Sequence, residues 1–282
     1  MCQIEMDHCA YTYQPCGINA YQALFDINIK IQQGELVAII GHGGSGKSTL
    51  AFLLAGLFSP QDGSVRIDGS IAPDKDIFSQ VSLVFQYPEQ QLFAESVFEE
   101  IAFGARNFGV AEDRLPLRVR KALNAVGLDP ELYWHRSPFT LSGGEKRRVC
   151  LGAMLAMDPH IVILDEPTAG LDEGGRRWIK ELIASLNKEG KTVIWISHDM
   201  AEVAELARRV IVMEKGRTIM DGTPESVFAC ETRLREAGLD IPKAAALVYG
   251  LKNRGLEIPG HAITVETAFA EIRDYLEGRR HV

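Results

Sequence analysis

The sequence predicts an α/β fold whose central sheet is mostly parallel and covered by helices on both faces. The first observation is a set of short, nearly continuous apolar runs: LVAII (36–40), HIVILD (160–165) and KTVIWIS (191–197). The second is that a segment with helical character follows each run, an alternation typical of parallel strands buried on both faces. The third is the composition of the 282 residues, 46% apolar and 24% charged, which suits a soluble globular chain with a substantial core.

The expected elements of the first half follow in order. Residues 1–35 alternate apolar and polar positions and predict short strands, which we assign to an antiparallel β subdomain. A glycine-rich turn leads into a helix at about 47–57, and 59–69 holds a further strand between two turns. Residues 88–157 are mostly helical and form a helical subdomain.

The second half continues the alternation and then changes character. Helices are expected at 174–188 and 199–208, followed by a hairpin that turns at Lys215-Gly216. We therefore place one large domain at 1–222 and a small C-terminal helical extension at 223–282.

The extension carries a repeated phrase and an amphipathic helix. AGLDIPKA (237–244) echoes RGLEIPGH (254–261), and in each a glycine followed by a proline marks a helix end. The last helix should begin at Thr264. Three apolar side chains share one of its faces: Phe269, Ile272 and Leu276. This face either packs against its own domain or forms a contact between two subunits.

Charge, hydropathy and cysteine usage exclude several classes of protein. The net charge of −8 argues against a nucleic-acid-binding surface. The longest apolar runs, such as AFLLAGLF, are far shorter than the ~20 residues that span a bilayer, and the first residues lack the apolar core of a signal peptide. Five cysteines without a C-x-x-C pair favour reduced thiols over a disulfide framework or a zinc site. We expect a cytosolic protein.

GHGGSGKST (41–49) has the spacing G-x-x-x-x-G-K-[ST] between a predicted strand and a predicted helix. Its glycines allow backbone N–H groups to surround phosphates, and the helix N-terminus adds positive potential. Lys47 is expected to reach the β- and γ-phosphates of a nucleotide, and Ser48 to ligate Mg²⁺. The whole loop supplies expected nucleotide contacts: Gly41, Gly43, Gly44, Ser45, Gly46, Lys47, Ser48 and Thr49.

An acidic pair follows the apolar strand in IVILDEP (161–167). Two adjacent carboxylates at a strand end are costly unless they meet a cation or water. Asp165 suits Mg²⁺ held mainly through water, and Glu166 suits a general base that polarises an attacking water. The pair alone says little, but together with the phosphate loop it indicates nucleotide hydrolysis.

LSGGEKRRV (141–149) has both a structural and a functional interpretation. Ser142 and Glu145 fit an S-x-x-E capping box, which by itself only starts a helix. Gly143 and Gly144 weaken that helix, however, and fit a bare backbone that approaches an anion. Because the chain already has one phosphate loop, this second anion site points to a nucleotide bound by another subunit.

With these motifs in this order, the sequence resembles the ATP-binding cassette (ABC) ATPases over about residues 4–230. LSGGE matches their signature, and AGLD, which ends at Asp172, matches their D-loop. His198 after VIWIS matches the switch histidine, although a lone histidine at a strand end is more often structural. In VFQYPEQQLF, Gln86 matches the Q-loop glutamine, and Tyr13 matches the aromatic that stacks on adenine, with Tyr11 as the alternative.

The resemblance implies a RecA-like P-loop NTPase fold with ATP and Mg²⁺ as cofactors. The implied catalytic residues are Glu166, His198, Gln86 and Lys47. The implied metal contacts come from Ser48, Gln86 and Asp165. Two subunits are expected to enclose two ATP molecules, each completed by Ser142, Gly143, Gly144 and Asp172 of the partner.

More narrowly, the chain resembles the ATPases of energy-coupling factor importers, and most of all the second of their paired ATPases. VFQYPEQQLF, LSGGEKRRV, GLDIP and GLEIP carry this resemblance. It implies a peripheral subunit on the cytoplasmic face of the cell membrane that powers uptake of a vitamin or a transition-metal micronutrient. The implied partners are a second ABC ATPase in a homo- or heterodimer that forms through 223–282, an integral membrane coupling subunit and a substrate-binding membrane subunit, with no nucleic acid.

Three alternatives stay open at this point. An ABC importer of another class, or a soluble ABC ATPase, would share every nucleotide motif. A P-loop kinase or GTPase would share the phosphate loop but has no use for LSGGE.

VFQYPEQQLF is expected to link ATP chemistry to a membrane partner. Gln86 would sense the γ-phosphate, and Pro88 would end the strand and free the following segment to move. An apolar floor for the partner's coupling helix is expected from Leu92, Phe93, Val97 and Ile101. Glu89 and Glu95 would pair with arginines on that helix.

Overall fold

The central sheet has six strands, and all but one of them are parallel. The computed structural model describes residues 2–73 and 75–279. In spatial order the strands are β10 (Arg217–Gly222), β9 (Arg209–Glu214), β3 (Leu36–Gly41), β8 (Thr192–Ile196), β7 (Ile161–Asp165) and β6 (Val81–Val84). Only β10 runs antiparallel, as the second strand of the hairpin predicted at Lys215-Gly216. The predicted sheet type is confirmed.

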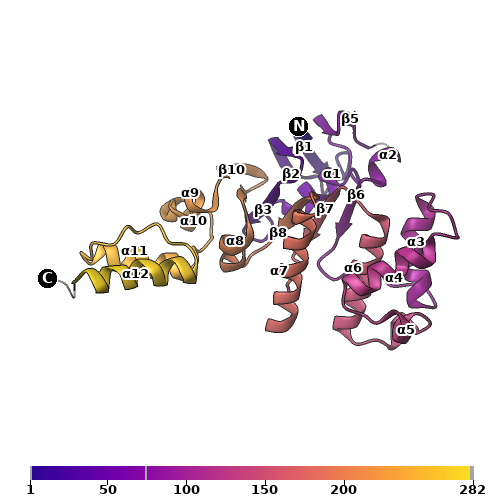
Figure 1. The fold of residues 1–282 in the computed structure, drawn as a ribbon. Coiled ribbons are helices and arrows are strands. Elements are labelled where there is room, and N and C mark those ends of the chain that lie inside the picture. The colour runs from indigo at the N-terminus through magenta and orange to yellow at the C-terminus, as the bar shows by residue number, and fades with distance from the viewer. Residues whose placement is uncertain (1, 74, 280–282) are drawn as a thin grey trace.

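A second, antiparallel sheet lies against one side of this assembly. Its order is β2 (Tyr21–Gln32), β1 (Cys2–Tyr13), β4 (Asp62–Ile67) and β5 (Ser70–Ile71). Where short strands were expected, β1 and β2 are each 12 residues long and pair along their length with several irregularities in register. Figure 1 shows these strands at the top of the molecule, beside α1 (Lys47–Leu54).

Alternate residues of the central strands belong to two separate cores. In β3, Ala38 and Ile40 join the core on the helical side, whereas Val37 and Ile39 join the core shared with the antiparallel sheet and α1. All four are fully buried. Since successive side chains of a strand point to opposite faces, a strand covered on both faces must be apolar throughout. This requirement explains the LVAII run.

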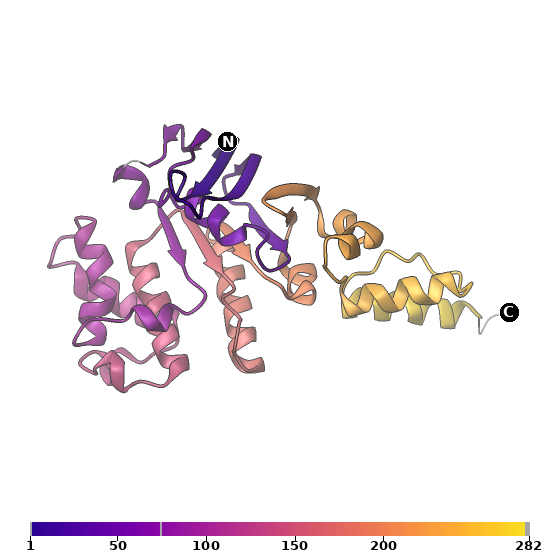
Figure 2. The same cartoon turned by 180° about the vertical axis from the view of Figure 1, so that it is seen from behind.

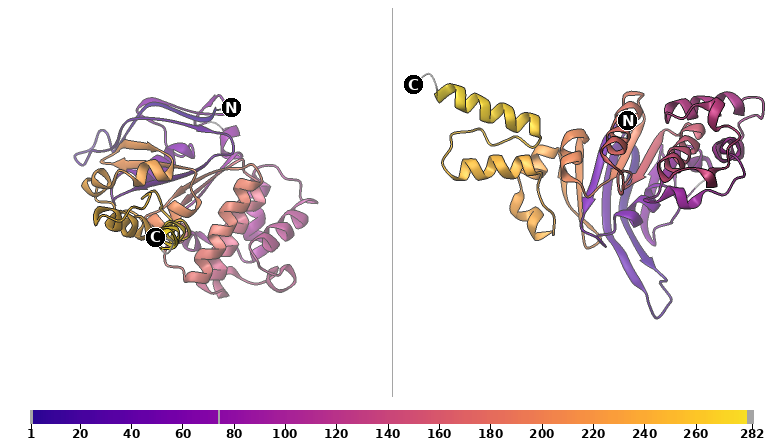
Figure 3. Two further views of the ribbon diagram at one scale, coloured as in Figure 1. Left: turned by 60° about the vertical axis from the view of Figure 1, so that its left-hand side comes forward. Right: turned by 90° about the horizontal axis from the view of Figure 1, so that it is seen from below.

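The remaining helices divide into a helical subdomain, helices on the sheet and a C-terminal arm. The subdomain follows β6 and contains η1 (Pro88–Gln91), α3 (Val97–Asn107), α4 (Leu115–Ala125), α5 (Pro130–Tyr133), η2 (Pro138–Thr140) and α6 (Gly143–Met157). Helices in or beside the sheet region are α2 (Lys75–Phe78), α7 (Glu173–Lys188) and α8 (Met200–Leu206). The last helices are α9 (Pro224–Phe228), α10 (Glu231–Glu236), α11 (Lys243–Asn253) and α12 (Val265–Arg279). Figures 2 and 3 show that the arm and the helical subdomain lie on opposite sides of the sheet.

The C-terminal arm is anchored in the main core before it leaves the domain. Phe228, Leu234 and Ile241 are buried together with residues of the central sheet, so this core continues past residue 222. Farther out, α11 and α12 bury a small cluster of their own around Val248. The repeated phrases end α10 and α11 as expected, with positive φ angles of 73° at Gly238 and 88° at Gly255.

The exposed face of α12 bears on how the arm is used. Phe269 is 66% exposed and Leu276 is 56% exposed, and with Ile272 they line a shallow groove on the helix. Within the described residues this face is therefore not packed against its own domain. No helix in the described part of the chain is long and apolar enough to cross a membrane.

Candidate functional site

The phosphate loop lies between β3 and α1 and encloses its own lysine. Gly44 and Gly46 have φ angles of 78° and 100°, which a residue with a Cβ adopts only under strain. The buried Nζ of Lys47 donates to the carbonyls of Gly41 at 2.7 Å and His42 at 3.0 Å. Burial lowers the pKa of Lys47, while the nearby Glu166 and Asp165 carboxylates act in the opposite direction. The ammonium group is thus held within the loop by two backbone carbonyls.

Asp165 joins the end of β7 to the start of α1. Its Oδ2 accepts a hydrogen bond of 2.8 Å from Ser48 Oγ, so two of the three predicted metal contacts lie together. Burial is the largest effect on Asp165 and raises its pKa, whereas the bond from Ser48 favours the ionised form. A cation beside this carboxylate would offset the cost of its burial.

Glu166 is held in an unusual backbone conformation. Its φ angle is 48°, in the left-handed region that non-glycine residues rarely adopt. Its backbone N–H donates to the carbonyl of Ile196 at the end of β8, at 3.0 Å. Such outliers persist where the surrounding structure fixes them, and they cluster at functional sites.

The Glu166 carboxylate contacts two other residues of the predicted catalytic set. Its Oε2 accepts from Gln86 Nε2 at 3.1 Å and lies 3.0 Å from Nδ1 of His198. With Glu166 ionised, that contact places the proton of the imidazole on Nδ1 and leaves Nε2 free for another partner. In the described part of the chain no hydrogen bond reaches Glu166 Oε1. Oε2 thus contacts Gln86 and His198, and Oε1 is available to a reactant.

The signature segment presents bare backbone at the start of α6. Ser142 and Glu145 form the predicted capping box, and a hydrogen bond from Tyr133 is the main reason that the pKa of Glu145 falls to about 2. A Cβ added at Gly143 or Gly144 would meet no atom within 4 Å, so both glycines face open space. No hydrogen bond or ion pair of the described residues joins this segment to the phosphate loop of the same chain.

Asp172 caps the helix that follows the D-loop. Its Oδ1 accepts from the backbone N–H of Gly175 at 2.8 Å at the N-terminus of α7. The predicted interface residue is thus fixed at a helix start, as Ser142 is.

The two candidate tyrosines have different surroundings. Tyr11 stacks on Phe58 with ring centroids 4.9 Å apart and packs against the core. The hydroxyl of Tyr13 lies 3.0 Å from Oγ1 of Thr49, on the helix that follows the phosphate loop. Tyr13 therefore lies beside the helix that starts at the phosphate loop, and its role as the adenine contact stays a prediction.

Arg147 is a residue of the site that the sequence reasoning missed. Its buried guanidinium donates to the carbonyls of Gln86 and Ala169 and to the carboxylate of Glu89. The available signal was helical periodicity: Arg147 falls on the same buried face of α6 as Leu151. Glu89, which was expected to pair with an arginine of a membrane partner, accepts in this structure from an arginine of its own chain, and its pairing with a partner stays a prediction.

A groove follows the Q-loop, but its lining differs from the prediction. A hollow of about 380 Å³ lies between η1, α3 and α6. Phe93 lines it as expected, together with Phe103 and Phe108. The other predicted floor residues are buried in the core: Leu92, Val97 and Ile101. These positions form the inward face of the segment, so the side chains between them reach the surface.

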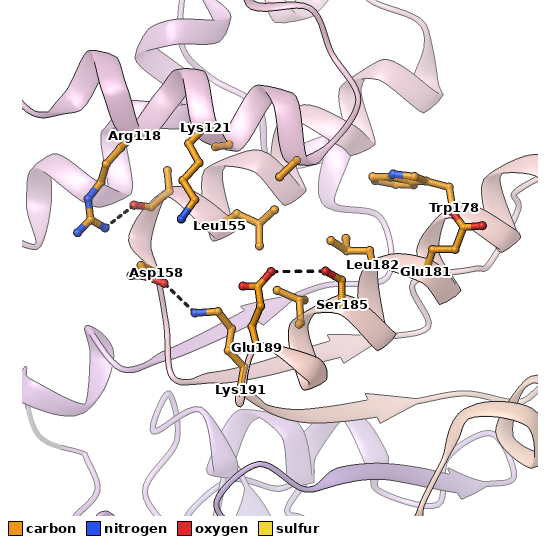
Figure 4. A pocket seen from close by; sticks show the side chains of 14 residues that line it. Arg118, Lys121, Leu155, Asp158, Trp178, Glu181, Leu182, Ser185, Glu189 and Lys191 are labelled. Atoms are coloured by element: carbon orange, nitrogen blue, oxygen red, sulfur yellow. Dashed lines mark hydrogen bonds and ion pairs between the residues drawn. The ribbon is translucent and has the colours of Figure 1, made fainter.

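A larger cleft of about 480 Å³ lies between α4, α6 and α7 (Figure 4). At its edge Arg118 donates to the carbonyl of Ala156 in the last turn of α6, and Lys191 donates to Asp158, which follows that helix. None of the predicted nucleotide residues lines this cleft. This cleft is therefore a gap between the helical subdomain and α7, and it is separate from the predicted nucleotide site.

Comparison with known proteins gives a consistent result. The ABC transporter family profile matches residues 24–169. The energy-coupling factor transporter ATP-binding protein EcfA2 of Symbiobacterium thermophilum is 46% identical over 98% of both chains, and that of Clostridium perfringens is 45% identical over 94% of this chain and 95% of its own.

Solved structures agree with the sequence relatives. The structure of cbiO1 from Clostridium perfringens, part of the ABC transporter complex cbiONQ, has a TM-score of 0.71 and 35% identity, covering 83% of this chain and 94% of its own. The ATP-binding cassette MJ0796, a dimer in a post-hydrolysis state bound to ADP and phosphate, has a TM-score of 0.70 and 27% identity, covering 78% and 98%.

Proposed function

Because this chain belongs to the ABC transporter family and to its energy-coupling factor ATP-binding proteins, we propose that it hydrolyses ATP to drive a membrane importer. The imported substrate is a vitamin or a transition-metal micronutrient, which membrane partner subunits bind and pass. The observation that carries the chemistry is the Glu166 carboxylate, which gathers Gln86 and His198 beside the phosphate loop. The chain acts at the cytoplasmic face of the cell membrane as a peripheral subunit.

ATP binding is assigned to the phosphate loop and Tyr13. The backbone N–H groups of the loop hold the β-phosphate, and Lys47 exchanges its carbonyl partners for phosphate oxygens. Tyr13 stacks on the adenine from its position beside Thr49. Binding of the anionic nucleotide raises the pKa of Lys47 again, because it offsets the burial of the ammonium group.

The residues beside the loop suit Mg²⁺. Ser48 and Asp165 are already in contact through oxygen atoms, and the side-chain carbonyl of Gln86 offers a third oxygen. The described residues hold no cluster of three or more His, Cys, Asp or Glu side chains that would bind a metal alone, so phosphate oxygens and water complete the shell. When bound, the ion neutralises charge that develops on the phosphates.

Hydrolysis is assigned to Glu166 with two supporting residues. Its free Oε1 accepts a proton of the attacking water, while Oε2 stays anchored to Gln86 and His198. Nε2 of His198 then contacts the γ-phosphate. The left-handed backbone of Glu166 fixes the direction of its carboxylate, so water and phosphate meet in line.

Each ATP is completed by a second subunit. Ser142, Gly143 and Gly144 offer a helix N-terminus and open backbone to the γ-phosphate bound by the partner, and Asp172 of the D-loop contributes to the same interface. Closure of the dimer therefore depends on ATP, and hydrolysis reopens it. The exposed face of α12, with Phe269 and Leu276, keeps the two arms together during the cycle.

The groove beside η1 takes the coupling helix of the integral membrane subunit. It is apolar, and its exposed aromatic residue Phe93 comes directly after the segment that contains Gln86. A helix that enters this groove touches the same segment whose glutamine contacts Glu166.

Membrane extraction tests the importer role. The tagged chain should extract from membranes in a complex with an integral membrane subunit, and vesicles that contain the complex should take up substrate only with ATP. Phe93→Asp should release the chain from the membrane subunit and leave its own ATPase activity unchanged. Leu117→Asp, at an even more exposed apolar site on α4, should leave both the complex and the ATPase activity unchanged. A chain that hydrolyses ATP but forms only soluble complexes would support a soluble ABC ATPase instead.

A further inference from the structure

Arg147 lies at the meeting point of three segments that are far apart in sequence. It follows the signature glycines on α6, and its side chain is only 7% exposed. Its guanidinium donates to four acceptors: Ala169 O at 2.8 Å, Gln86 O at 3.2 Å, Glu89 Oε2 at 3.4 Å and Pro167 O at 3.5 Å.

These acceptors flank the reacting residues on both sides. The side chains of Gln86 and Glu166 meet at 3.1 Å, and the guanidinium bonds the carbonyl of Gln86 itself and that of Pro167, the neighbour of Glu166. A guanidinium is a planar fork with donors in fixed directions, so it fixes the spacing of the groups that it bonds. The backbones that carry Gln86 and Glu166 are therefore tied to one rigid group.

The fourth acceptor connects this group to the groove. Glu89 lies in η1, whose Pro88 and Gln91 line the groove, and its carboxylate supplies the countercharge that a buried guanidinium requires. A shift of η1 moves Glu89, which in turn changes the hydrogen bonds that Arg147 makes to the loop after Glu166. The path runs from Glu89 through Arg147 to Pro167, the neighbour of Glu166, and the side chains of Glu89 and Arg147 are mostly buried.

The adjacent arginine provides a comparison. Arg148 lies on the same helix, but its guanidinium stacks 4.1 Å above the ring of Trp178 and donates to the carbonyl of Val126. It therefore attaches α6 to its surroundings without a bond to the Q-loop or to the loop after Glu166.

We propose that Arg147 is a positioning residue for hydrolysis: it sets the spacing of Gln86 and Glu166 and transmits a shift of η1 to them. The proposal rests on the ATPase function assigned above. If Arg147 were only structural, it would attach α6 to the sheet, and its substitution would not change the rate at which bound ATP is hydrolysed.

The test compares Arg147→Lys with Arg148→Lys in the full chain. Lysine keeps the charge but replaces the fork with a single ammonium, which cannot bond all four acceptors. Because a displacement of about 1 Å in a catalytic group costs up to ~10²-fold, we expect kcat to fall about 10- to 100-fold, with the Kd for ATP unchanged within about threefold. Arg148→Lys should leave kcat within about twofold.

A double mutant separates positioning from folding. In the Glu166→Gln background the carboxylate that Arg147 would position is already absent. Arg147→Lys should therefore lower the residual rate of ATP hydrolysis by less than about threefold. Glu89→Gln, at a side chain that is 24% exposed, should lower kcat by less than Arg147→Lys and leave Tm close to that of the parent. It serves as the second variant if Arg147→Lys does not fold.

The outcomes are distinct. A normal kcat in both Arg147→Lys and Glu89→Gln, or equal losses of kcat and ATP affinity, or full additivity with Glu166→Gln, would overturn the proposal. A parent protein without ATPase activity would overturn the assigned function instead.

Discussion

Glu166→Gln isolates the role of a single oxygen atom. The Oε2 atom of Glu166 accepts from Gln86 and contacts His198, at 3.1 and 3.0 Å, and the amide oxygen of glutamine can occupy the same place with both contacts kept. The amide NH₂ then stands where Oε1 was. The substitution therefore leaves the framework in place and converts the one free acceptor into a donor that cannot take a proton from water.

The size of the effect follows from that change. General base catalysis contributes about 10²- to 10⁴-fold, so kcat should fall by at least ~10², which corresponds to about 2.7 kcal/mol in activation free energy. ATP should bind as tightly as before or tighter, because one negative charge near the phosphates has been removed. Since bound ATP persists, the closed dimer should accumulate.

Phosphate release measures kcat, a fluorescent ATP analogue measures affinity, and size-exclusion chromatography with ATP measures the closed dimer. Glu189→Gln, at the C-cap of α7, is the matched control and should behave as the parent in all three assays. Turnover within about threefold of the parent in Glu166→Gln would refute the role given to Oε1.

Four further outcomes are expected. Tyr13→Ala should weaken ATP binding about 10-fold while Tyr11→Ala mainly lowers Tm, as ATP titrations and thermal melts will show; the reverse pattern would assign adenine to Tyr11. Because the pKa of Glu145 in the folded chain is about 2, against an ordinary 4.5, its stabilisation is present above pH 4.5 and lost as pH falls toward 2; the Tm gap to Glu145→Ala should shrink over that interval, and a constant gap would contradict this. Phe228→Ala should lower the free energy of unfolding by about 3–5 kcal/mol in urea titrations, although it lies outside every nucleotide motif; a loss below ~1 kcal/mol would mean that the arm is not part of the core. Leu276→Asp should weaken dimerisation without ATP in sedimentation measurements, and an unchanged dimer would place the contact elsewhere.

The parts of the site that the sequence could predict are those in which neighbouring residues act together. The phosphate loop and the acidic pair each lie within a few residues, and a buried strand before each of them fixes its direction. The parallel sheet then brings the ends of β6, β7 and β8 to one edge. The meeting of Gln86, Glu166 and His198 follows from this topology.

What could not be predicted depends on backbone atoms and on the direction of helix faces. Arg147 bonds three carbonyls, which carry no side-chain signature, at sequence separations of 20 to 61 residues. The floor of the groove was misplaced because Val97 and Ile101 are apolar on the inward face of α3, one turn apart. Phe103 lies on another face of that helix and lines the groove.

The arm and the nucleotide domain meet within a single helix. At its first turn α11 contributes Ala245 to the core of the sheet, and one turn later Val248 belongs to the core of the arm. In the described chain the nucleotide domain and the arm are thus joined through a continuous helix and not through a flexible linker. Gly238 also lies against the ring of His42 in the phosphate loop. Two arms joined to each other would therefore form a rigid connection between the two ATPase domains of a dimer. This connection would return the two domains to the same alignment after every turnover.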